Sequence, residues 1–116
     1  MSVLSPSAVD ASEWQYAVGL AELDDDVPVS VDVDGVPVCL VRRGRRVRAL
    51  LDVCSHQDYP LSQGEVTDDT IECCVHGACF DLSTGAALTL PATEPVPVYP
   101  VRLWAGKVYV VVTEPD

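Results

Sequence analysis

The stretch CSHQDYPLSQGEVTDDTIECCVHGACFDL, residues 54–82, holds the most informative pattern in this chain. It contains two short runs, Cys54-Ser55-His56 and Cys73-Cys74-Val75-His76, which have the spacings C-x-H and C-x2-H. The chain has only two histidines, and both lie in these runs. Thiolates and imidazoles are soft ligands that select iron–sulfur clusters, zinc or copper. The two runs therefore predict a metal centre held by two loops.

The alternation of Cys and His favours two metal ions over one. Structural zinc sites commonly keep like ligands together, as C-x2-C paired with H-x3-5-H. Here each loop supplies one Cys and one His, which suits a [2Fe–2S] centre with two His on one iron, the Rieske ligand set. We therefore predict one [2Fe–2S] cluster, with Cys54 and Cys73 on one iron and His56 and His76 on the other. The alternatives are a Cys2His2 zinc site or unrelated thiols and imidazoles.

Charge and cysteine content restrict the partners and the compartment. The chain has 116 residues and 48% hydrophobic residues, which fits one domain with a modest core. Its net charge of −11 opposes binding to nucleic acid or to anionic membranes. Five cysteines cannot all pair internally. With no signal-peptide pattern and no long apolar run, we expect a cytoplasmic protein whose thiols stay reduced.

Alternating apolar residues and turn signals predict an all-β fold. Asp34-Gly35 is a strong two-residue hairpin signal between strands expected at 27–33 and 36–41. The other expected strands lie at 14–19, 45–52, 98–104 and 107–112, with short β segments at 70–72 and 80–82. We predict an antiparallel β-sandwich or barrel base that carries a small cluster-binding subdomain, with its loops at about 53–81. This domain spans 13–116 and follows a flexible N-terminus at 1–12.

The paired runs and their flanks resemble the Rieske-type ferredoxins, the small ferredoxin components of bacterial ring-hydroxylating dioxygenase systems. The resemblance extends from about Asp32 to Thr113 and includes Pro91-Ala92-Thr93 and Pro95-Val96-Pro97-Val98-Tyr99, which match the family's Pro-rich segment beside the cluster. It implies a Rieske iron–sulfur fold in which the two His ligands lie near the surface, at the tip. Residues 57–61 then become the expected docking face.

The sequence departs from the high-potential branch of that family in two ways. Those proteins have an additional Cys in each cluster loop, and the two form a disulfide, whereas residues 57–61 and Val75 supply none here. Ser and Tyr hydroxyls beside the cluster are replaced by Ala78 and Phe80. Fewer hydrogen bonds to the sulfurs leave the reduced cluster less stabilised, so we expect a potential of roughly −150 mV, the lower end of the Rieske range.

The chain lacks the parts that would complete a redox reaction alone. Both histidines are used by the cluster, so no 2-His-1-carboxylate iron site is left, and no G-x-G-x-x-G fingerprint is present. We expect a one-electron carrier, not an enzyme. The resemblance implies a monomer that docks transiently with a flavin-dependent ferredoxin reductase and a non-haem iron oxygenase. The alternatives are a Rieske-like protein of iron–sulfur assembly or nitrite reduction, or a zinc module.

The remaining cysteines and a group of arginines have no role in this scheme. Cys39 is expected to be buried, and Cys74 is a minor alternative to Cys73 as a ligand. Five of the seven basic residues lie in Arg42–Arg48. We interpret them as solvated charges that flank a hairpin turn and discourage edge pairing, with a docking face as the alternative. Both tryptophans are expected in the core.

Overall fold

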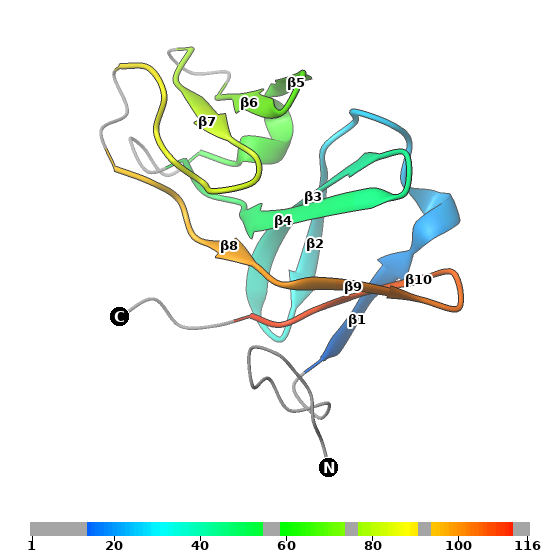
Figure 1. Ribbon diagram of the computed structural model, residues 1–116. Coiled ribbons are helices and arrows are strands. Elements are labelled where there is room, and N and C mark those ends of the chain that lie inside the picture. The colour runs from blue at the N-terminus through cyan, green and yellow to red at the C-terminus, as the bar shows by residue number, and fades with distance from the viewer. Residues whose placement is uncertain (1–13, 55–58, 74–76, 91–93, 113–116) are drawn as a thin grey trace.

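The computed structural model describes residues 14–54, 59–73, 77–90 and 94–112, and in these ranges it is almost entirely β-structure (Figure 1). The elements in chain order are β1 (Gln15–Gly19), η2 (Leu20–Glu22), β2 (Val29–Val33), β3 (Val36–Arg43), β4 (Arg46–Leu51), η3 (Leu61–Gln63), β5 (Glu65–Thr67), β6 (Thr70–Glu72), β7 (Cys79–Asp81), β8 (Val98–Tyr99), β9 (Val101–Trp104) and β10 (Lys107–Val110). The two η elements are single 3-10 turns. The predicted all-β fold is confirmed.

Two antiparallel sheets form the base of the molecule. One has the order β1-β10-β9 and the other β2-β3-β4-β8. They share a core, here called the base core, to which β3 contributes Val38 and Leu40 and β10 contributes Val108 and Val110. Period-2 alternation places these side chains on one face of their strands, as expected for packed sheets.

A third antiparallel sheet, β5-β6-β7, lies at one end of the base and corresponds to the predicted subdomain (Figure 1). Its core, here called the subdomain core, combines Ile71 and Phe80 of this sheet with Cys39 and Val41 of β3. Residues 38–41 of β3 are therefore all buried, because successive side chains enter the two cores in turn. A strand that is covered on both faces needs a continuous apolar run instead of an alternating one.

Turns and prolines set the limits of several strands. Asp34 and Gly35 both have positive φ, at 53° and 83°, as the expected type I′ hairpin requires. The second hairpin turns at Gly44 and Arg45, since Arg43 pairs with Arg46.

The prediction of a single strand at 98–104 was wrong, because the structure divides this segment into β8 and β9 at Pro100. Pro100 has no N–H to donate to a ladder, and the chain passes there from the sheet of β4 and β8 to that of β9 and β10.

The tryptophans do not occupy the core, contrary to expectation. Trp104 is 68% exposed on β9. Trp14 is half-buried, with the guanidinium of Arg102 lying 5.1 Å from its ring centroid. Within the described residues, no helix has the length and apolar character needed to cross a membrane.

Candidate metal centre

The two predicted cysteine ligands lie where strands end and loops begin. Cys54 follows β4, and Cys73 directly follows β6. Each is only 2% exposed, and both belong to the subdomain core. The structure thus brings both thiols into one apolar environment. His56 and His76, the predicted imidazole ligands, lie outside the described residues, as does Cys74.

The loops that begin at these two cysteines are closed in the same way. The Cys54 N–H donates to the Tyr59 carbonyl at 2.8 Å, and the Cys73 N–H donates to the Ala78 carbonyl at 2.6 Å. In both loops residue i bonds to residue i+5, and each closed loop contains one of the two histidines. Two equivalent loops, each with one thiol and one imidazole, match the donor set of a binuclear centre.

Gly77 and Gly64 allow the second loop to lie close to its neighbours. Gly77 has a φ of 75°, and its N–H donates to the Cys73 carbonyl at 3.1 Å. A Cβ at Gly64 would lie 1.8 Å from the carbonyl oxygen of Glu72, the residue before Cys73. A side chain at Gly64 would therefore displace the backbone that leads into the loop.

The first loop is anchored by Asp52, which sequence reasoning missed. Its carboxylate accepts hydrogen bonds from the Ser62 N–H at 2.7 Å and from the Ser62 hydroxyl at 2.8 Å. Its own N–H donates to the Pro37 carbonyl. Asp52 is 4% exposed and is the only buried charged side chain among the described residues. The one sequence feature that could have indicated this role is the position of Asp52, a single acidic residue between the apolar Leu51 and Val53.

We expect Asp52→Ala to lower the free energy of unfolding by about 2–3 kcal/mol, because two half-buried Ser62 donors lose their charged acceptor. Urea unfolding of the cluster-loaded protein measures this change. Asp32→Ala is the matched control, since Asp32 accepts one exposed hydrogen bond from the Gly35 N–H and should cost less than about 1 kcal/mol. Equal losses in the two variants would contradict the anchoring role of Asp52.

The two other described cysteines differ from the predicted ligands. Cys39 is fully buried in β3, as predicted. Burial raises the pKa of its thiol far above the ordinary value, and the charge of Asp52 raises it further. Cys39 therefore stays a thiol at neutral pH, whereas metal ligation needs a thiolate. Cys79 is half-buried in β7, with its Sγ 3.8 Å from the Gly77 carbonyl oxygen.

The described residues fit a metal–sulfur group well. Two thiols lie buried at the heads of matching loops, and the side chains packed around them are apolar, among them Leu61, Ile71 and Phe80. Such a shell limits solvent access, which tunes an iron–sulfur centre. The fold and the site together define a small all-β metalloprotein that holds its metal between two loops.

Residues 13–100 match the family model described as the Rieske [2Fe-2S] domain, and the chain belongs to this family. Its cofactor is one [2Fe–2S] cluster, which sets aside the zinc alternative. The chain is 38% identical over 99 residues to the anthranilate 1,2-dioxygenase ferredoxin subunit of Burkholderia cepacia, covering 85% of this chain and 92% of that relative.

Solved structures agree with this assignment. The ferredoxin of carbazole 1,9a-dioxygenase from Nocardioides aromaticivorans IC177 has a TM-score of 0.84 and 34% identity, covering 86% of this chain and 98% of that chain. A chain in a complex of reduced oxygenase and oxidized ferredoxin in carbazole 1,9a-dioxygenase has a TM-score of 0.79 and 31% identity, covering 84% and 92%.

Proposed function

We propose that this protein is a one-electron carrier that passes electrons to the terminal oxygenase of a ring-hydroxylating oxygenase system. The observation that carries the proposal is the pair of identically closed loops, each with a buried cysteine at its head. The relatives are ferredoxin subunits of dioxygenases, and one of the similar structures is a complex of an oxygenase with its ferredoxin. These relatives disfavour the alternatives of iron–sulfur assembly and nitrite reduction.

The ligands in this proposal are Cys54, His56, Cys73 and His76. The bound cluster supplies the redox chemistry by taking up and releasing one electron. The chain's own residues keep the two thiolates away from water and close each loop with a backbone hydrogen bond. Tyr59, which accepts the bond that closes the first loop, is 40% exposed and belongs to the proposed docking face. The face expected at 57–61 ends at Pro60, because Leu61 is fully buried in the subdomain core.

The proposal also includes a donor, an oligomeric state and a compartment. The donor is a flavin-dependent ferredoxin reductase, because the sequence contains no dinucleotide-binding fingerprint of its own. The carrier acts as a monomer, since transient redox docking uses small interfaces. A reducing cytoplasm keeps the ligand thiols available for the cluster.

Anaerobic electron transfer tests the function directly. The dithionite-reduced protein, freed of dithionite, is mixed with the oxidised terminal oxygenase of the same organism, and both spectra are followed by stopped flow. We expect the carrier to be reoxidised as the oxygenase Rieske centre is reduced, in a one-electron exchange. Failure to exchange electrons, with a cluster confirmed by iron and sulfide analysis, would contradict the proposal.

We also expect the cluster to have a low reduction potential, and a substitution at Phe80 tests this expectation. Phe80 is fully buried in the same core as the two thiols, at the position where the high-potential branch has a Tyr. We expect Phe80→Tyr to raise the midpoint potential by about 60 mV, because a hydrogen bond worth about 1.4 kcal/mol to the reduced state corresponds to that shift for one electron.

Protein-film voltammetry measures this shift against the unmodified protein, which should lie at roughly −150 mV. Phe80→Leu is the control, because it changes packing without adding a hydroxyl. An equal shift in the Tyr and Leu variants would assign the effect to packing, and a wild-type midpoint above about +100 mV would contradict the low-potential expectation itself.

A further inference from the structure

Three of the five clustered arginines have partners within the fold. Arg42 donates to the carbonyls of Leu20 and Leu23 at 2.9 and 3.2 Å. Arg43 pairs with Asp26 at 2.9 Å, and Arg48 lies 3.7 Å from Asp69. Interpreting all five as solvated charges was therefore wrong for Arg42, which ties β3 to the η2 segment. Arg43 and Arg48 are largely balanced by carboxylates.

Arg45 and Arg46 differ from these three arginines in their exposure and in their lack of a carboxylate partner among the described residues. Both are exposed, at the tip of the β3–β4 hairpin. Within the described ranges, neither forms an ion pair with a carboxylate, although the chain contains 18 acidic residues. We call residues 43–46 the arginine turn. It leaves two uncompensated positive charges on a chain whose net charge is −11.

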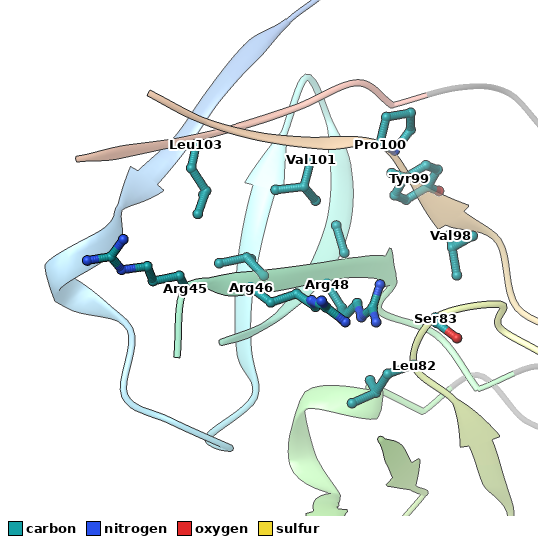
Figure 2. A pocket seen from close by; sticks show the side chains of 12 residues that line it. Arg45, Arg46, Arg48, Leu82, Ser83, Val98, Tyr99, Pro100, Val101 and Leu103 are labelled. Carbon is teal, nitrogen blue, oxygen red and sulfur yellow. The ribbon is translucent and has the colours of Figure 1, made fainter. Parts of the chain in front are cut away.

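Two hollows flank the arginine turn, and Arg45 and Arg46 line both. The first, of about 390 Å³, lies between β4 and the segments that carry Ser83 and Pro100 (Figure 2). The second, of about 520 Å³, is lined by Arg43, Arg45, Arg46 and Asp69. In Figure 2 Arg45 points away from Arg46, so the two charges cover separate parts of the surface. Each hollow has room for side chains of another molecule.

The arginine turn and the metal centre lie at opposite ends of β4. Arg46 begins this strand, and Cys54 comes three residues after its last residue, Leu51. At about 3.3 Å per residue, the strand alone separates the two by roughly 17 Å. A molecule bound at the turn therefore need not cover the loops that hold the cluster.

We propose that the arginine turn is a docking surface for a protein that presents carboxylate side chains, which pair with Arg45 and Arg46 while the metal centre stays accessible. Nucleic acid fits less well, because a phosphate backbone needs an extended basic surface and would be repelled by the rest of this acidic chain. A protein can place a few carboxylates at the turn and neutral or basic groups elsewhere. The proposal does not depend on which proteins donate or accept the electron.

The test uses the cluster-loaded protein and, as the probe, a short synthetic peptide with two glutamates in an otherwise neutral sequence, at low salt of about 20 mM, where screening is weak. We expect amide chemical shifts of residues 43–48 to move on titration and binding to weaken as salt is raised. Arg45→Gln/Arg46→Gln should weaken binding by about fivefold or more, because two exposed charge pairs are lost. These side chains form no ion pair with any residue that the structure describes, so the variant should keep the wild-type visible spectrum.

Lys107→Glu is the matched control, because it changes the net charge by the same two units at an exposed position of β10. We expect it to bind the probe within about twofold of wild type. A wild-type protein that does not bind the probe, or an equal loss in the control, would overturn the proposal. Tighter binding of a single-stranded oligonucleotide than of the glutamate peptide would overturn it in favour of nucleic acid.

Discussion

Protein in which Cys73 is replaced by alanine is expected to be colourless and to contain no stoichiometric iron or sulfide. Cys73 is buried at the head of the second loop, and its backbone closes that loop onto Ala78. In the proposed ligand set, one iron would lose half of its protein ligands without this thiolate. Iron and sulfide analysis, the visible spectrum and the reduced-state electron paramagnetic resonance signal together measure the loss.

The neighbouring cysteines provide the controls for this experiment. Cys74→Ala and Cys79→Ala should each retain a full cluster with the spectrum of the unmodified protein, because only Cys73 has the C-x2-H spacing to His76. A colourless Cys74→Ala protein beside a coloured Cys73→Ala protein would move the ligand by one residue. The same measurement on Cys54→Ala should reproduce the result for Cys73→Ala.

Gly85→Ala is expected to destabilise the protein by about 3 kcal/mol or more, or to prevent folding. Gly85 has a φ of 79°, which disfavours any L side chain, and a Cβ there would lie 2.0 Å from the Val96 carbonyl oxygen. Its own carbonyl accepts the Val96 N–H at 2.9 Å. The substitution therefore forces apart the turn after β7 and the Pro-rich segment. Urea unfolding followed by circular dichroism gives the size of the effect.

Gly106→Ala separates the steric effect from the conformational one. Gly106 has nearly the same φ, 76°, but an added Cβ would meet nothing within 4 Å. The expected cost is therefore only the left-handed backbone penalty of about 1–2 kcal/mol. A loss as large as that of Gly85→Ala would show that backbone conformation alone, and not the contact with Val96, explains both results.

The sequence predicted those parts of the fold that depend on local patterns. The hairpin at Asp34 and Gly35 and the strands around it follow from alternation and from residues that tolerate positive φ. It did not predict the division at Pro100, because a proline in an apolar run shows only that a ladder bond is missing, not which sheet the chain enters next. Strand β5 was not predicted.

The metal centre was partly predictable for the same reason. Ligand spacing is a local property, so Cys54 and Cys73 were identified, and the structure places both in one buried core. The roles of Asp52 and Arg42 were not foreseen. Each depends on a partner distant in the chain, Ser62 for Asp52 and Leu20 and Leu23 for Arg42, and charged residues carry no sequence mark of such contacts.

Strand β3 passes its side chains alternately into both cores, and this has a consequence for electron transfer. Cys39 and Val41 belong to the same buried core as the two thiols, while Val38 and Leu40 belong to the base core. The metal-binding part is thus joined to the base by a shared strand that is buried on both faces. We expect the two parts to keep their relative positions during a redox cycle, which would keep the reorganisation energy small and favour rapid, repeated turnover.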